Sequence, residues 1–165
     1  MYGGSTILKK DLKATNGNVQ ILNDVMIPPQ QTVVSILDAN NNFKIFTNAL
    51  RKDALAEELR NLRGPFTIFA PKDDRIENDA SLKMKISDPT QLREFVRDHI
   101  VEGIYYGTLF EGDQEVILTS LSGKDITLRN NAMSRMLSAN GVSVNQSDIR
   151  GTNGLVHIVD DVIRK

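Results

Sequence analysis

The sequence predicts one α+β domain in which early helices pack on a β-sheet formed mainly by later residues. The 165 residues are 40% apolar and 25% charged, which suits one globular domain with about 20 to 30 residues to spare. Apolar residues recur with helical spacing before residue 64, whereas the chain beyond residue 104 reads mostly as strands. Helices first and strands later indicate segregated layers rather than a wound parallel sheet.

Four apolar stripes with helical spacing predict the helices. They cover residues 33–37, 43–50, 55–62 and 92–100. Thr32, Asp53 and Asp88 are suited to cap the starts of three of them. Asn40-Asn41-Asn42 separates the first two stripes, and Pro89 suits the first position of the last helix.

The expected strands are short and separated by turn residues. The run from Phe66 to Ala70 is β-rich, too short for a helix, and ended by Pro71. Further strands are expected at residues 116–121, 126–129, 132–138, 142–145 and 155–163. Ser122-Gly123-Lys124-Asp125 is suited to a hairpin connection. Residues 72–87 are polar and weakly periodic, so we expect a loop and a short helix there.

The chain repeats itself at an offset of 137 residues. The run Thr-Asn-Gly-Asn-Val-Gln-Ile-Leu-Asn-Asp-Val at residues 15–25 matches Thr-Asn-Gly-Leu-Val-His-Ile-Val-Asp-Asp-Val at residues 152–162. Upstream, Asp11-Leu12-Lys13 matches Asp148-Ile149-Arg150 at the same offset. A period of this length is a domain-sized repeat rather than a solenoid unit.

The repeat divides the chain into three parts. We interpret residues 1–27 as the tail of a preceding domain, residues 28–31 as a junction stiffened by two prolines, and residues 32–165 as one complete domain. Because the tail carries strand sequences without the rest of its own domain, we expect it to be mobile or to make an intermolecular, homophilic contact.

Composition argues against several classes of function. Twenty basic and 21 acidic residues give a net charge of −1 without a basic cluster, which argues against nucleic acid and anionic membranes as partners. No apolar run reaches the ~18 residues of a membrane span, and no signal peptide is visible at the start. The chain has no Cys, and its two histidines match no metal-site spacing. Nucleotide-binding and hydrolase motifs are also missing, so we expect no catalytic residue, metal or cofactor.

Three segments carry short motifs that are typical of one known domain family. The family block Thr-Val-Phe-Ala-Pro-Thr-Asn/Asp resembles the run Phe66-Thr67-Ile68-Phe69-Ala70-Pro71-Lys72-Asp73-Asp74. The run from Asn153 to Ile163 resembles the block near the domain end, and Phe95-Val96-Arg97-Asp98-His99-Ile100 resembles the segment Leu-Leu-x-Tyr-His-Val. The chain thus resembles the fasciclin family of adhesion domains, and the resemblance covers about 130 residues. It implies a fasciclin-like α+β fold, cell adhesion through integrin-type receptors or matrix proteins, an extracellular location and no enzymatic activity.

The resemblance implies four candidate receptor-binding residues. Asp98 and His99 stand where the family has Tyr-His, a proposed integrin-binding element, and Asp98 in place of Tyr weakens that assignment. Asp148 and Ile149 match a second proposed element, an acidic residue followed by Ile. Integrins recognise a carboxylate that completes the oxygen shell of a bound cation, and one exposed Asp on a loop suffices for this. The same dipeptide also suits a simple turn.

Structural interpretations compete with these assignments. His99 lies on an apolar helical stripe, where a histidine bonded to the backbone is the common case. His157 corresponds to Gln20 in the first copy, which favours a structural or solvent-facing role over imidazole chemistry. Asn145-Gln146-Ser147 satisfies the glycosylation sequon if the protein is secreted. Residues 73–79 are acidic but lack the spacing of a calcium loop. Self-assembly of fasciclin domains is the alternative function.

Overall fold

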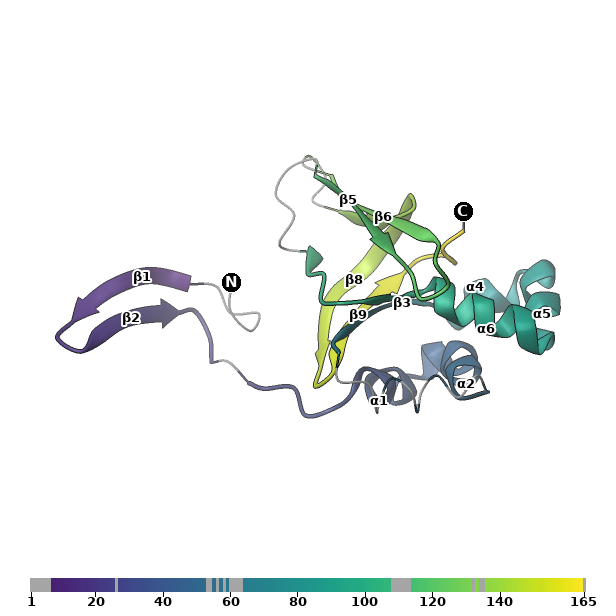
Figure 1. Ribbon diagram of the computed structural model, residues 1–165, viewed down its shortest axis with the longest axis horizontal. Coiled ribbons are helices and arrows are strands. Elements are labelled where there is room, and N and C mark those ends of the chain that lie inside the picture. Colours follow the sequence, from purple (N-terminus) through teal and green to yellow (C-terminus); the bar gives the residue numbers. More distant parts are fainter. Residues whose placement is uncertain are drawn as a thin grey trace. The chain divides into compact units, whose positions relative to one another are not determined.

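The computed structural model describes residues 7–25, 27–52, 55, 57, 59, 64–107, 114–131, 133 and 136–164. The chain divides into two compact units, Met1–Gln30 and Gln31–Lys165 (Figure 1). The smaller unit is an antiparallel hairpin of β1 (Ile7–Ala14) and β2 (Gly17–Leu22). The larger unit holds every other described helix and strand.

The helices of the larger unit begin where their capping residues allow. They are α1 (Val33–Asp38), the 3-10 helix η1 (Asn41–Phe43), α2 (Lys44–Lys52), α4 (Asp73–Glu77), α5 (Ala80–Ser87) and α6 (Pro89–Asp98). The Thr32 side chain accepts a hydrogen bond from the Ser35 N–H and caps α1. Asp88 caps α6, and Pro89 occupies the first turn of that helix. These capping residues confirm the two helix starts that the sequence predicts.

A seven-stranded sheet forms the rest of the larger unit. Its order is β4-β3-β9-β8-β7-β6-β5. The strands are β3 (Phe66–Pro71), β4 (Ile100–Glu102), β5 (Glu115–Thr119), β6 (Asp125–Asn130), β7 (Leu137–Ala139), β8 (Val142–Gly151) and β9 (Gly154–Val159). β3 and β9 are parallel, and the other neighbours are antiparallel. A bridge between Val101 and Ser120 links the two ends, so the sheet is nearly closed.

The two faces of this sheet bury two hydrophobic clusters. One cluster lies between the helices and the β3–β9 pair, where Ile68 and Val156 pack with helical residues such as Phe46. The other fills the inside of the curved sheet and includes Phe69 and Val159. Alternate side chains of β3 therefore point into different clusters. Figure 1 shows the helices gathered beside β3 and β9. The predicted α+β fold is confirmed.

Several local predictions were wrong or incomplete. The expected strand 155–163 ends at Val159, the last residue of β9. His99 ends α6, and Ile100 starts β4 instead of continuing the helix, because Ile68 of β3 pairs with it. β8 runs on to Gly151, although its polar middle reads as a loop. Residues 72–87 form two helices, α4 and α5, rather than a loop with one short helix. Within the expected strand 132–138 only the last two residues join β7, which ends at Ala139, and residues 132, 134 and 135 lie outside the described residues.

The third predicted helix falls partly outside the described residues. Asp53, its expected cap, and residues 60–63 are among those left out. Leu55 and Leu59, which belong to the same apolar stripe, are fully buried and belong to the cluster beneath the helices. No helix within the described ranges is long and apolar enough to span a membrane.

Candidate adhesion surfaces

Asp98 lies at the end of α6, on the side that faces the connection between β5 and β6. Its carboxylate accepts a hydrogen bond from the Ser122 hydroxyl at 2.5 Å and pairs with Lys124 Nζ at 2.9 Å. Lys124 Nζ also lies 2.6 Å from a carboxylate oxygen of Glu94. The hydrogen bonds with Glu94 and then Asp98 raise the pKa of Lys124. Asp98 is thus a paired carboxylate, with 21% of its side chain exposed.

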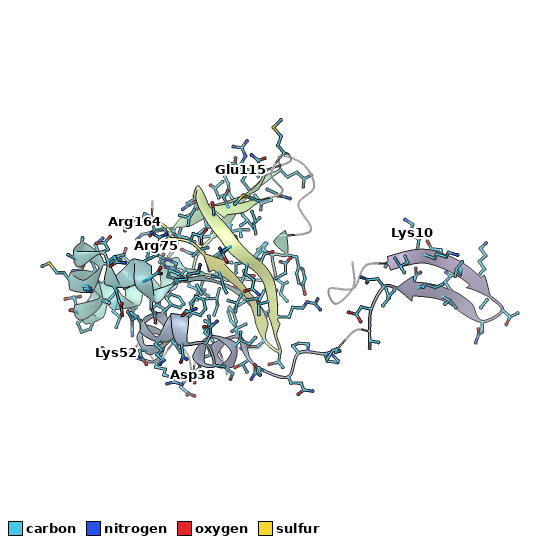
Figure 2. The ribbon with its side chains drawn as sticks, turned by 180° about the vertical axis from the view of Figure 1, so that it is seen from behind. Lys10, Asp38, Lys52, Arg75, Glu115 and Arg164 are labelled. Atoms are coloured by element: carbon cyan, nitrogen blue, oxygen red, sulfur yellow. The ribbon has the colours of Figure 1, made fainter. Side chains whose placement is uncertain are left out.

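A cavity of about 310 Å³ lies beside this ion-pair cluster. Apolar side chains of Leu82, Phe95 and Ile126 line part of it, and charged side chains stand among them. One of these is Arg164, labelled in Figure 2, which pairs with Asp79 at 2.5 Å. The backbone N–H of Leu82 and the Arg164 guanidinium lower the pKa of Asp79. The cavity combines apolar surface with charges of both signs.

His99 is fully buried at the end of α6. Its Nδ1 is 2.8 Å from the carbonyl oxygen of Phe95, and its Nε2 is 3.1 Å from the backbone nitrogen of Ile163. Since the Ile163 N–H can only donate, Nε2 accepts and Nδ1–H donates, which is the neutral imidazole. Burial lowers the pKa of His99 to about 4. His99 therefore joins α6 to the C-terminal segment and presents no surface of its own.

Asp148 and Ile149 lie at an irregularity of β8. The pairing of β8 with β9 shifts register between Gln146 and Ile149, and Asp148 has a left-handed φ of 64°. The Asp148 carboxylate accepts a hydrogen bond from the Gly107 N–H at 2.8 Å. Ile149 is half-buried and packs against the cluster beneath the helices. This dipeptide has a structural role whether or not it also binds a receptor.

His157 is buried on β9 and bonds to the backbone of the irregular stretch (the bulge) of β8 that contains Asp148. Its Nδ1 accepts from the Asp148 N–H at 3.3 Å, so its Nε2–H donates to the carbonyl oxygen of Tyr105 at 2.8 Å. The ring stacks on Phe69 with 5.3 Å between centroids. Burial lowers the pKa of His157 and favours the neutral imidazole. Both histidines of the chain, His99 and His157, therefore use both ring nitrogens for backbone groups.

The two pairs of candidate residues occupy different places in the fold. Asp98 has partners on the β5–β6 connection, whereas Asp148 binds Gly107 and His157. Sequence reasoning missed Lys124 as a partner of Asp98, because 26 residues separate the two and no local pattern links them. Asn145 is exposed on β8, at the register shift between Val144 and Gln146. Among the described residues, no group of three His, Cys, Asp or Glu side chains is placed to hold a metal ion.

Comparison with known proteins decides the family. The model of the Fasciclin domain matches residues 41–165. The chain belongs to the fasciclin family. Members of this family are linked to cell adhesion. The structure of the FAS1 domain pair from the insect cell adhesion molecule fasciclin I superposes with a TM-score of 0.66, at 19% identity, over 98% of this chain and 60% of that one.

The similarity to curated fasciclin relatives extends over nearly the whole chain. Human periostin is 27% identical over 161 residues, covering 96% of this chain and 19% of periostin. The transforming growth factor-beta-induced protein ig-h3 of Oryctolagus cuniculus is 29% identical over 168 residues, covering 97% of this chain and 23% of that protein. The chain thus spans about a fifth of the length of these two relatives.

One relative carries the name of an enzyme. The heme ligase of Plasmodium falciparum (isolate 3D7) is 25% identical over 190 residues, covering 99% of this chain and 93% of that protein. Fasciclin domains are mostly non-catalytic. In the present chain both imidazoles bond to backbone groups through both ring nitrogens.

Proposed function

We propose that this fasciclin domain is an extracellular adhesion module that binds cell-surface receptors of integrin type, or matrix proteins. The observation that carries the proposal is the family match over residues 41–165. Similarity to periostin and to the transforming growth factor-beta-induced protein over almost all of the chain supports it. The proposal assigns no catalytic residue and no cofactor to the domain.

The first proposed contact is the Asp148–Ile149 bulge. Asp148 is half-buried, and one of its carboxylate oxygens accepts a hydrogen bond from the Gly107 N–H. A carboxylate offers about four lone-pair sites on two oxygens, so this bond leaves acceptor capacity for a receptor-bound cation. Ile149 would add apolar contact only through the part of its side chain that lies outside the core.

The second proposed contact is the surface around Asp98. Here Asp98, Glu94 and Lys124 form a charged cluster at the edge of the cavity described above. His99 lies beneath this surface and is proposed as a positioning residue, because both its hydrogen bonds hold the end of α6 against the C-terminal segment. A receptor whose binding surface carries both positive and negative side chains would complement this cluster.

Cell attachment with two matched variants tests the proposal. Asp148→Asn removes the negative charge but keeps an oxygen that accepts from Gly107, and Asn tolerates the left-handed backbone at this position. Asp98→Asn removes a charge of the same sign at the other surface. We expect cells to attach to a surface coated with the chain, and a divalent-cation chelator to abolish attachment.

The variants then separate the two surfaces. We expect Asp148→Asn to raise the coating concentration for half-maximal attachment about tenfold, as a loss of about 1.4 kcal/mol in receptor affinity would, with the midpoint of thermal unfolding unchanged. Asp98→Asn should reduce attachment only if the second surface takes part. Attachment that resists both substitutions and the chelator would overturn the integrin-type proposal. Failure of the folded wild-type chain to attach cells would overturn the adhesion proposal itself.

Asn145 is proposed to carry an N-linked glycan in the secreted protein. The sequon residues Asn145, Gln146 and Ser147 are all exposed, so the asparagine is accessible. Expression in a secreting eukaryotic cell should give a product whose electrophoretic mobility increases after glycosidase treatment. Asn145→Gln and Ser147→Ala should both abolish that change, whereas Ser143→Ala, on the same strand, should not.

Self-assembly is the alternative function. It is favoured by the exposed β1–β2 hairpin, whose apolar side chains Leu8 and Val19 are 63% and 50% exposed. Sedimentation of the full chain over a range of concentrations tests this alternative. A species that remains monomeric at all concentrations would exclude self-assembly through the hairpin.

A further inference from the structure

The β1–β2 hairpin reproduces the β8–β9 hairpin pair by pair. Ala14 pairs with Gly17 as Gly151 pairs with Gly154, and Leu12 pairs with Val19 as Ile149 pairs with Val156. The two register shifts of β1–β2 also occur at the positions equivalent to those of β8–β9. The sequence repeat at an offset of 137 residues is therefore a structural repeat as well.

The irregular part of the hairpin is reproduced in its hydrogen bonding. Asp11 has a left-handed φ of 58°, and its counterpart Asp148 has a φ of 64°. The Asp11 N–H donates to the side-chain oxygen of Gln20 at 3.1 Å, just as the Asp148 N–H donates to His157 Nδ1. Gln20 and His157 occupy equivalent positions, and each supplies a neutral acceptor to the backbone N–H of the aspartate.

Neither the space around position 17 nor its backbone conformation requires a glycine there. A Cβ atom built on Gly17 would meet no atom within 4 Å, and its φ lies outside the left-handed region. At the equivalent Gly154, a Cβ atom would lie 2.1 Å from the carbonyl oxygen of Phe66 in the adjacent strand β3. Glycine at position 154 is thus required by the neighbouring strand. Glycine at position 17 fits a hairpin with such a neighbour.

The apolar side chains of β2 are also exposed where those of β9 are buried. Val19 and Ile21 are 50% and 40% exposed, whereas their counterparts Val156 and Ile158 are 0% and 6% exposed. Among the described residues, β2 pairs with β1 on one edge and with no strand on the other. β9 has β8 on one edge and β3 on the other.

We propose that the open edge of β2 is a docking site for a parallel strand of the β3 type, contributed by another fasciclin core whose closing hairpin is β1–β2. By the register of β3 with β9, the incoming strand would place the counterpart of Phe66 opposite Gly17 and that of Ile68 opposite Val19. Residues 1–27 are then the tail of a preceding fasciclin domain. This proposal is independent of the receptor that the larger unit binds.

The strand cannot come from the larger unit of the same chain or of a second folded copy. There β3 already has β4 on one edge and β9 on the other, so no edge of it is free. The β2 edge also differs from an unpaired edge that accepts any strand. The incoming strand must pass close to Gly17, which specifies one register and a parallel direction. The occupant is therefore a fasciclin core that lacks its own last hairpin.

A peptide with the sequence Gly64–Asp73, extended by lysines for solubility, is the probe for this site. It contains the whole of β3 and is added to the isotope-labelled full chain, with amide shifts followed by NMR. We expect shifts confined to β2, Gly17–Leu22, and none from a peptide of scrambled sequence. The effect on β2 is expected to saturate as the peptide concentration rises.

Two hairpin variants make the test specific. Gly17→Val places a side chain at the close approach and should weaken peptide binding at least tenfold, while the free hairpin has room for it. Asn16→Ala, one residue away in the turn, should bind the peptide like wild type. The absence of shifts in β2 at millimolar peptide, equal binding by Gly17→Val, or dimerisation of the chain through β2 would each overturn the proposal. Cell attachment is not needed for any of these readouts.

Discussion

At the scale of single residues, His99 makes the stability of the domain depend on pH. Its two hydrogen bonds, to the Phe95 carbonyl and from the Ile163 N–H, require the neutral ring. The pKa of histidine is 6.5 in the unfolded chain, and burial lowers it to about 4 in the fold. Between these values the unfolded state binds a proton that the folded state does not, so the free energy of unfolding falls as the pH falls.

We expect urea titrations to show a loss on the order of 3 kcal/mol from His99 between pH 6.5 and pH 4, with no contribution above that range. His99→Gln should be less stable than wild type at neutral pH, because glutamine lacks the ring that packs against Phe46 and Phe95. Its stability should nevertheless fall less steeply over the same range. His157 titrates in the same direction in both proteins, so the difference in slope reports His99 alone. Equal slopes would contradict the assignment.

The two equivalent glycines are expected to respond differently to the same substitution. Gly154→Ala should destabilise the larger unit by about 3 kcal/mol or more, because the new Cβ atom forces β9 away from the Phe66 carbonyl. Gly17→Ala should leave its unfolding midpoint unchanged, since nothing lies within 4 Å. Thermal unfolding followed by circular dichroism compares the two. A similar loss in both variants would show that Gly17 already has a close neighbour.

At the scale of elements, Asp73 connects two helices of the larger unit. It lies in the first turn of α4, and its two carboxylate oxygens accept hydrogen bonds from the backbone N–H groups of Lys44 and Ile45, at 2.8 and 2.9 Å. These N–H groups belong to the first turn of α2, where α2 itself has no carbonyl four residues earlier to accept them. Asp73, the acidic residue of the first fasciclin block, thus caps the start of α2 from a different helix, α4.

We expect Asp73→Ala to lower the free energy of unfolding by about 1–2 kcal/mol, as the loss of a helix cap does. Asp73→Asn should recover part of this, because its oxygen can still accept one N–H. Asp74→Ala is the matched control: it removes the same charge from the next residue, which is exposed. Denaturant unfolding of the three variants gives the comparison. If Asp74→Ala costs as much as Asp73→Ala, the charge rather than the cap is responsible.

Elements with local signals could be predicted from the sequence, and those set by distant partners could not. The caps Thr32 and Asp88 fixed the starts of α1 and α6 because they bond within the same turn. β4 has no such signal: Ile100 continues an apolar helical stripe, and only pairing with β3 makes it a strand. The polar middle of β8 is likewise held in the sheet by β9.

The candidate residues show the same limit. The family motifs located Asp98 and Asp148, but the groups that hold them come from elsewhere in the chain. Lys124 reaches Asp98 across 26 residues, and Gly107 reaches Asp148 across 41. The apolar stripe predicted a backbone-bonded His99, whereas Gln20 at the position equivalent to His157 left both a structural and a solvent-facing role open, and only the structure shows that His157 is buried.

At the scale of the whole molecule, the chain holds one nearly closed sheet and one open hairpin with the same pairing. The seven-stranded sheet buries its β9 strand between two neighbours and two clusters. The hairpin has the register and bulge of β8–β9 but only two strands. Two strands alone are marginally stable in water, so most of the stability of β9 comes from its neighbours rather than from its hairpin.

Hydrogen exchange should therefore separate the two copies in the full chain. We expect amides of β2 to exchange at least about 100-fold faster than the equivalent amides of β9, because local opening suffices for β2 whereas β9 exchanges through opening of the core. Mass spectrometry of peptides covering residues 17–22 and 154–159 measures both in one sample. Removal of residues 1–30 should leave the exchange of β9 unchanged, since that strand takes its partners from the larger unit. Equal protection of the two copies would mean that β2 already has a second strand beside it, and the docking site proposed on its edge would then be occupied.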